Sequence, residues 1–318
     1  MTDILTVTLN PALDISAATD RVRPGPKLRL DEPVTEPGGG GINVARAAVK
    51  LGGAARAIAA LGGLTGARFA AVMAGSGVDL VVFPAPGETR QSLAVTDRGD
   101  GGQYRMQFPG PVWDASQAAA ILDLIAIEAG RIGPRAVVVL SGSQPPGMSA
   151  MFAQELARRL GDARLIIDTS GPALQRLVTT PARGQAPHVL RMDRAESEGL
   201  AGQTLPDPAA SLDFAQSLVR ADVADCVILA RGAEGSVLAT RDLRLLCRPP
   251  VVAVVSAIGA GDSFTAGFAL ALARGGDWAE ALLRGTAAAA AAVMTPGSEL
   301  CRADTAARIA PACMLTRA

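Results

Sequence analysis

A glycine-rich tetrapeptide, Gly259-Ala260-Gly261-Asp262, places one carboxylate beside a backbone that can bind an anion. It follows an apolar run, residues 251–255, that predicts a strand, and it precedes a predicted helix over residues 263–273. The first turn of a helix offers free N–H groups and the positive end of the helix dipole. Phosphoryl transfer needs that environment and a base for the attacking hydroxyl. A plain glycine turn with Asp262 as a helix cap is the alternative interpretation.

A second glycine run, Gly38-Gly39-Gly40-Gly41, precedes the predicted helix 42–51. Glycine lets a backbone approach a ligand closely, and Asn43 would project from the first turn. A flexible loop is the alternative, although four glycines before a well-patterned helix cost conformational entropy. Neither run is a Walker A loop, because no Gly-Lys-Ser/Thr follows. Neither is a dinucleotide fingerprint, because the first strand runs into Asn10-Pro11.

Three basic residues, Lys27, Arg29 and Arg90, fall in or beside short alternating segments that predict strands. Such a cluster could hold the phosphate of a sugar phosphate, with arginine supplying bidentate geometry. Solvated surface charge is the alternative for each residue taken separately. The single histidine, His188, has no partner visible in the sequence, and we expect a surface or satisfied core histidine.

Short β-branched runs alternate with amphipathic helix patterns along most of the chain, which predicts a doubly wound, mostly parallel sheet flanked by helices. The predicted strands are 4–9, 136–140, 165–168 and 227–230, and the predicted helices are 42–51, 151–160 and 212–219. Alternating segments at 27–30, 92–96 and 103–108 predict a small sheet with one polar face. No linker divides the chain, so we expect one domain over 1–318 with a lid inserted from about 12–36 and 88–110.

Composition limits the classes of function. The chain has 318 residues, of which 49% are hydrophobic, and 30 basic residues balance 30 acidic ones. A balanced charge gives no global field for nucleic acid or an anionic membrane. The four cysteines are widely spaced and predict neither a zinc site nor a disulfide framework. No signal peptide or membrane-spanning segment is indicated, so we expect a cytoplasmic protein.

An ordered series of motifs resembles the ribokinase-like sugar kinases of the phosphofructokinase B family, from Leu9 to about Thr305. The likeness is strongest to the minor 6-phosphofructokinases of enteric bacteria. The matching segments are 13–14, 27–29, 36–47, 89–91, 141–147 and 259–263. The resemblance implies a ribokinase-like fold, ATP as the phosphoryl donor with Mg²⁺, and a homodimer formed through the lid.

The resemblance also implies roles for individual residues. It implies that Asp262 is the catalytic base, beside the anion hole of Gly259, Ala260 and Gly261. It implies that the sugar phosphate is bound by Asp14, Lys27, Arg29, Gly38, Gly39, Asn43, Arg90, Ser141 and Ser143. It implies that the nucleotide is bound by Arg191, Asp193, Ala230, Gly232, Gly235, Ser256 and Ile258, with the alanine-rich helix around 287–292 near the adenine. Magnesium would be held through water by Glu196 and by Asp193, and potassium near Ser256, Ile258, Thr295 and Gly297.

Three departures from the family pattern concern nucleotide and metal binding. The segment that is Lys-Pro-Asn-x-x-Glu in the family is Arg191-Met192-Asp193-Arg194-Ala195-Glu196 here. The ionised Asp193 adds negative charge and cannot donate a hydrogen bond, although it could order a magnesium-bound water. Ala257 replaces a usual threonine, and Arg231 precedes Gly232 where an uncharged residue is more usual.

Position 40 bears on the substrate, because 1-phosphofructokinases and tagatose-6-phosphate kinases usually carry a lysine within this glycine motif. Gly40 therefore favours fructose 6-phosphate. The leading hypothesis is an ATP-dependent 6-phosphofructokinase. The alternatives are a kinase for fructose 1-phosphate or tagatose 6-phosphate, and a noncatalytic sugar-phosphate or nucleotide sensor that keeps the fold. A nicotinamide dehydrogenase is disfavoured because the glycine fingerprint is absent.

Overall fold

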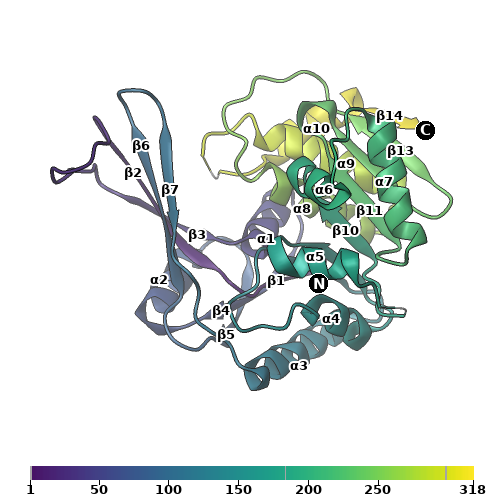
Figure 1. Ribbon diagram of the computed structural model, residues 1–318, viewed down its shortest axis with the longest axis horizontal. Coiled ribbons are helices and arrows are strands. Elements are labelled where there is room, and N and C mark those ends of the chain that lie inside the picture. Colours follow the sequence, from purple (N-terminus) through teal and green to yellow (C-terminus); the bar gives the residue numbers. More distant parts are fainter. Residues whose placement is uncertain (1, 183, 298) are drawn as a thin grey trace.

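The computed structural model describes residues 2–182, 184–297 and 299–318. Its main sheet has the order β14-β13-β12-β11-β10-β9-β8-β1-β4-β5 (Figure 1). The bounds are β1 Ile4–Thr8, β4 Ala55–Leu61, β5 Asp79–Pro84, β8 Val137–Ser141, β9 Arg164–Asp168, β10 Val189–Met192, β11 Cys226–Ala230, β12 Ser236–Ala239, β13 Arg244–Arg248 and β14 Met314–Arg317. The strands from β5 to β11 are parallel, and β12, β13 and β14 add antiparallel. The predicted doubly wound sheet is confirmed.

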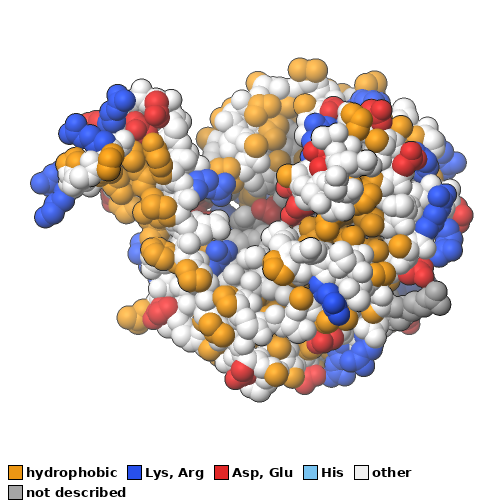
Figure 2. Space-filling view, in the orientation of Figure 1, with side chains coloured by type: hydrophobic (Ala, Val, Ile, Leu, Met, Phe, Trp, Pro, Cys, Tyr) orange, Lys and Arg blue, Asp and Glu red, His pale blue; other side chains and the backbone are white. Residues whose placement is uncertain are grey.

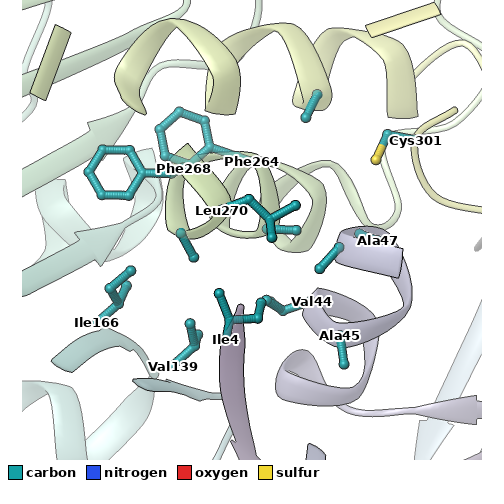
Figure 3. Packing of buried hydrophobic residues seen from close by; sticks show 14 of the residues in the cluster. Ile4, Val44, Ala45, Ala47, Val139, Ile166, Phe264, Phe268, Leu270 and Cys301 are labelled. Atoms are coloured by element: carbon teal, nitrogen blue, oxygen red, sulfur yellow. The ribbon is translucent and has the colours of Figure 1, made fainter. Parts of the chain in front are cut away.

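Helices cover both faces of this sheet. One face carries α1 Gly40–Lys50, α2 Gly63–Met73, α8 Ala260–Ala273, α9 Trp278–Ala292 and α10 Ala303–Ile309. The other carries α3 Ala115–Ile132, α4 Phe152–Leu160, α5 Gly171–Thr179, α6 Arg194–Ala201 and α7 Pro208–Arg220. Along β1, Ile4 packs into the first layer (Figure 3), while Leu5 and Val7 pack into the second. Burial on both faces explains why the strands are almost continuously apolar.

A small sheet projects from the body (Figure 1). Its order is β3-β2-β6-β7, with β3 Val34–Gly38, β2 Ala12–Thr19, β6 Arg90–Asp97 and β7 Gln103–Gln107. The register pairs Asp14 with Ser92 and Ala94 with Arg105, so these residues share one face. Tyr104 and Met106 alternate with Arg105 and belong to the opposite face. The predicted polar face is confirmed.

Two predicted strands are wrong. Residues 251–255 form no regular element, and Val251, Val254 and Val255 are exposed. An apolar β-branched run was the only signal there, and the structure pairs this run with no strand. Residues 27–30 are likewise irregular and exposed, so the alternation of basic and apolar residues marks an extended surface segment.

The order of strands changes direction at β1. The chain proceeds from β1 to β4 and β5 on one side and returns to β8, β9, β10 and β11 on the other. In open parallel sheets, ligands bind at the carboxyl ends of strands where the order reverses. Within the described part of the chain, no helix is long and apolar enough to cross a membrane.

Candidate active site

The helix α8 begins at the glycine-rich tetrapeptide that the sequence predicted. Gly259 caps it with a left-handed backbone (φ 75°), and Asp262 lies in the first turn. Asn43, in the first turn of α1, donates its Nδ2 hydrogen to Oδ2 of Asp262 at 3.0 Å. Two helix N-termini that are 219 residues apart in sequence therefore meet at one carboxylate.

The Asp262 carboxylate is unusually basic. Burial raises its pKa, the nearby negative charge of Asp168 raises it further, and the hydrogen bond from Asn43 and the charge of Arg191 lower it, so that the pKa is about 7. The residue still keeps partial contact with solvent. A carboxylate with this pKa can accept a proton near neutral pH and keep it during a reaction.

The second glycine run packs so closely that side chains do not fit. A Cβ atom at Gly38 would overlap the carboxylate of Asp14, and one at Gly40 would overlap Oγ of Ser141 and lie 2.8 Å from the nitrogen of Gly142. Gly39 has a φ of 119°, a conformation that favours glycine. Gly38 ends β3, Gly39 caps α1, and Gly40 and Gly41 begin that helix, so the run belongs to regular structure and not to a loop.

Polar groups of the small sheet gather near this start. The Nε hydrogen of Arg90 is donated to the carbonyl oxygen of Asn10 at 3.1 Å, and Nδ2 of Asn10 donates to Oγ of Ser143 at 3.2 Å. Burial raises the pKa of Asp14, whereas the charge of Arg90 and a hydrogen bond from Ser92 lower it. The structure thus brings Asp14, Arg90 and Ser143 to one end of β2 and β6.

A cavity of about 380 Å³ opens between the polar face of the small sheet and the body. Figure 2 shows this hollow with charged side chains along it. Asp14, Ser92 and Arg105 line it on the sheet side, and Ile258 and Gly297 on the body side. Lys27 and Arg29 are exposed on the irregular segment 20–33, and neither they nor Arg90, at the start of β6, are among the described residues that line it. Within one chain the predicted basic cluster is therefore only partly assembled.

A second cavity, of about 390 Å³, lies on the other side of the α8 N-terminus. Its walls are mostly apolar and come from the segment 249–257, from η1 Gly232–Glu234 and from α9. The predicted residues Arg191, Ala230, Gly232, Gly235, Ala260 and Gly261 all line it, and so do Thr286, Ala289 and Ala290 of the alanine-rich helix. This shape suits a flat apolar ring with its polar end toward Gly261.

Arg191 projects from the end of β10 toward that polar end. Its Nη1 donates to both carboxylate oxygens of Asp168, at 2.9 and 3.1 Å, and its guanidinium lies 5.6 Å from the ring centre of Phe264. A Cβ atom on Gly261 would stand 3.0 Å from Nη2 of Arg191. Arg191 thus brings a positive charge directly to the anion hole. Sequence reasoning missed Asp168, whose only local signal was its place at the end of a strand.

Asp193 and Glu196 cap α6 reciprocally. Oδ1 of Asp193 accepts from the backbone of Glu196 at 2.8 Å, and Oε2 of Glu196 accepts from the backbone of Asp193 at 2.9 Å. Burial raises the pKa of Glu196, the hydrogen bond from the Asp193 backbone opposes this rise, and the negative charges of Asp193 and Asp168 add to it. No group of three or more His, Cys, Asp or Glu in the described ranges could hold a metal ion. The two carboxylates suit a water-mediated contact, since Mg²⁺ keeps several waters in phosphate complexes.

The other departures have simple structural outcomes. Arg231 is buried and does not line the second cavity. It donates to the carbonyl oxygens of Leu205 and Pro206, and its Nη2 lies 2.8 Å from Oε2 of Glu234. It braces the connection between α6 and α7. Ala257 lines the second cavity, so the methyl group stands where the family usually has a threonine.

The residues expected at the potassium site are partly gathered. Oγ of Ser256 donates to the carbonyl oxygen of Gly297 at 3.2 Å and accepts from the backbone of Ile258. Thr295 is buried and donates to the carbonyl oxygens of Ala292 and Leu300. Ser256 and Ile258 are not among the described residues that line the second cavity, so they belong to this neighbouring turn. His188 lines neither of these two cavities; its Nδ1 lies 3.3 Å from Oδ2 of Asp225 and its ring lies beside Trp278, as expected of a satisfied histidine.

Comparison with known proteins agrees with this geometry. Residues 2–306 match the pfkB family carbohydrate kinase model. The chain belongs to the pfkB family of carbohydrate kinases. It is 36% identical over 303 residues to ATP-dependent 6-phosphofructokinase isozyme 2 of Mycobacterium tuberculosis, covering 95% of this chain and 87% of that one. It is 33% identical over 273 residues to 1-phosphofructokinase of Xanthomonas campestris, covering 84% of this chain and 83% of that one.

Solved structures agree as well. Phosphofructokinase-2 of Escherichia coli in complex with substrates and products is 32% identical, with a TM-score of 0.85 over 97% of this chain and 98% of that one. The same E. coli enzyme has been solved in complex with potassium and in a tetrameric inhibited form. The pfkB kinase is therefore a sugar-phosphate kinase with a ribokinase-like fold. Its relatives include both 6-phosphofructokinases and 1-phosphofructokinases, so their names do not decide which sugar phosphate it accepts.

Proposed function

We propose that this pfkB kinase is a cytoplasmic ATP-dependent 6-phosphofructokinase, which converts fructose 6-phosphate to fructose 1,6-bisphosphate in glycolysis. The observation that carries the proposal is the position of Asp262. Its partner Asn43 lies in the first turn of α1, shortly after Gly38, which packs against the carboxylate of Asp14, and its neighbour Gly261 lines the apolar cavity. One base thus stands between a polar site for a sugar phosphate and an apolar site for a nucleotide.

The arrangement supports direct in-line transfer. The oxygen of the sugar's C1 hydroxyl attacks the γ-phosphorus of ATP, the bond between that phosphorus and the β–γ bridging oxygen breaks, and ADP leaves. Asp262 accepts the hydroxyl proton. The N–H groups at the start of α8 and the guanidinium of Arg191 stabilise the charge on the phosphoryl oxygens.

On the sugar side, Asp14 and Asn43 suit hydrogen bonds to sugar hydroxyls, together with the backbone of Gly38 and Gly39. Arg90 suits the 6-phosphate, and Ser141 and Ser143 suit the path between the two sites. On the nucleotide side, Ala230, Gly232 and Gly235 suit the nucleoside. Magnesium, when bound, neutralises charge on the phosphates, and Asp193 and Glu196 would hold it through water. Potassium would bind near Ser256, Ile258, Thr295 and Gly297.

Gly40 supports fructose 6-phosphate over fructose 1-phosphate. A side chain at position 40 would meet Oγ of Ser141 and the backbone of Gly142, so this chain has no room for the lysine that the related 1-phosphofructokinases usually carry there. The 33% identity with a 1-phosphofructokinase keeps fructose 1-phosphate as the second candidate, with tagatose 6-phosphate beside it.

We also propose a homodimer through the small sheet. Tyr104, Met106 and Phe108 expose 45%, 48% and 59% of their surfaces along β7 and its end. A contiguous apolar strip on a projecting sheet is typical of an interface. Light scattering should give twice the monomer mass for the wild type and the monomer mass for Met106→Glu. A dimer that survives this change would place the interface elsewhere.

The catalytic proposal is tested by sugar-dependent ADP release with Mg-ATP. We expect turnover of fructose 6-phosphate by the wild type and a loss of about 10²- to 10⁴-fold in kcat for Asp262→Asn. Asp277→Asn is the matched control, since Asp277 caps α9 and asparagine caps equally well. A wild type that releases no ADP in response to any sugar phosphate, or an Asp262→Asn variant with full activity, would contradict the proposal.

A further inference from the structure

Asp168 is a carboxylate that neither predicted site includes. It ends β9 and is mostly buried, with 14% of its side chain exposed. Besides the two contacts from Nη1 of Arg191, its Oδ2 accepts the hydroxyl of Thr265 at 3.0 Å. Thr265 is buried in α8, one turn after the anion hole. One carboxylate therefore ties together β9, β10 and α8.

This tie fixes the direction of Arg191. Nη1 faces Asp168, Cζ lies 5.6 Å from the ring centre of Phe264, and a Cβ on Gly261 would stand 3.0 Å from Nη2 and 3.2 Å from Nη1. Nε of Arg191 is buried without a hydrogen-bond partner in the described residues, so the hydrogen bonds to Asp168 and the ring of Phe264 orient the fork. The long arginine side chain otherwise has many rotamers, and only some would place a donor at the anion hole.

The need for such a tie follows from the residue type. Arginine presents a planar fork whose donors are useful only at a fixed angle, whereas lysine acts as a point charge that rotates freely. The sequence carries arginine at a position where the family usually has lysine. The hydrogen bonds to Asp168 use Nη1 and leave Nη2 for an incoming phosphate.

We infer that Asp168 and Thr265 are positioning residues, which hold the Arg191 guanidinium at the start of α8 so that it contacts the transferred phosphoryl group. The inference rests on the proposed function, because it takes the nucleotide to occupy the apolar cavity. Neither residue touches the reacting atoms, and their effect on the phosphoryl group passes through Arg191. The charge of Asp168 also raises the pKa of Asp262, so the variants are compared well above pH 7, where Asp262 is ionised in all of them.

A double-mutant cycle tests this dependence. We expect Asp168→Asn and Arg191→Met each to lower kcat/KM for Mg-ATP by about 10- to 100-fold, the range for a lost charge-assisted hydrogen bond. The KM for the sugar phosphate should stay within about twofold. Because Asp168 and Arg191 act through the same guanidinium, the double variant should have the same kcat/KM for Mg-ATP as Arg191→Met alone. Asp213→Asn, which breaks the exposed pair with Arg244, is the control and should match the wild type.

Two further measurements separate positioning from folding. Thr265→Val should also lower kcat/KM for Mg-ATP. Thr265→Ser should keep the wild-type value, because serine retains the hydroxyl that donates to Asp168. Methylguanidinium should rescue Arg191→Ala but not Arg191→Ala combined with Asp168→Asn. The inference would be overturned if the fold-losses of the two single variants multiplied in the double variant, or if Asp168→Asn left the KM for Mg-ATP unchanged. A wild type without sugar-dependent ADP release would instead refute the proposed function.

Discussion

Asn43 and Asp262 join the N-termini of α1 and α8 through one hydrogen bond of 3.0 Å. Each helix follows a glycine-rich turn: Gly38 packs against Asp14, which lines the first cavity, and Gly261 lines the second. The bond holds the carboxylate at the junction through Oδ2, and the proposed mechanism uses Oδ1 to accept the substrate proton. The position and basicity of this carboxylate are the basis of the proposed chemistry.

The pH dependence of activity should follow Asp262. Its pKa is about 7, so below that pH the carboxyl is protonated and cannot accept the hydroxyl proton. We expect kcat/KM for the sugar to rise about tenfold per pH unit below pH 7 and to level off above it, since this parameter reports the free enzyme. A flat profile between pH 5.5 and 8 would show that another group is the base.

The same raised pKa predicts a stability effect. The folded state holds the Asp262 proton more tightly than the unfolded state, so the stability that this group contributes is present at low pH and is lost as the pH rises through about 7. Asp262→Asn should therefore raise Tm by a few degrees at pH 8 and by less at pH 5. Differential scanning calorimetry of both proteins at the two pH values checks this. A larger gain at pH 5 would contradict the assigned cause.

Gly40→Ala tests the close packing that supports the choice of sugar. The added Cβ must displace Ser141 or the backbone of Gly142, so we expect kcat/KM for fructose 6-phosphate to fall by roughly tenfold or more, the loss that a small misplacement of reacting groups can cause. Gly130→Ala is the control, because a Cβ at Gly130 in α3 meets nothing within 4 Å. Equal activities of the two variants would remove the argument from Gly40.

Arg90→Ala should raise the KM for fructose 6-phosphate by about 10- to 100-fold, because a charge-assisted contact to the 6-phosphate is lost. The KM for Mg-ATP should change little. Arg308→Ala on α10 is the control, since Arg308 is exposed and hydrogen-bonds to Thr305 in its own helix. Lys27→Ala and Arg29→Ala should have comparable effects only if a partner subunit brings these exposed residues to the site. An Arg90→Ala variant with normal KM would place the phosphate elsewhere.

The sequence allowed the sheet, the small polar-faced sheet and both helix starts to be predicted, because each depends on local periodicity and glycine placement. Residues 251–255 were misjudged because a β-branched run alone cannot show whether a neighbouring strand exists. The inward turn of Arg231 and the partnership of Asp168 with Thr265 depend on contacts between distant segments. Arg105 was overlooked because only the strand register shows that it shares one face of the small sheet with Asp14.

The most direct test of the central claim is to measure kcat/KM for fructose 6-phosphate, fructose 1-phosphate and tagatose 6-phosphate at saturating Mg-ATP. The release of ADP is the signal that is measured. The proposed function predicts that fructose 6-phosphate has the highest value, by about tenfold or more. A higher value for fructose 1-phosphate or tagatose 6-phosphate would contradict the assignment of the substrate, while leaving the kinase chemistry at Asp262 in place.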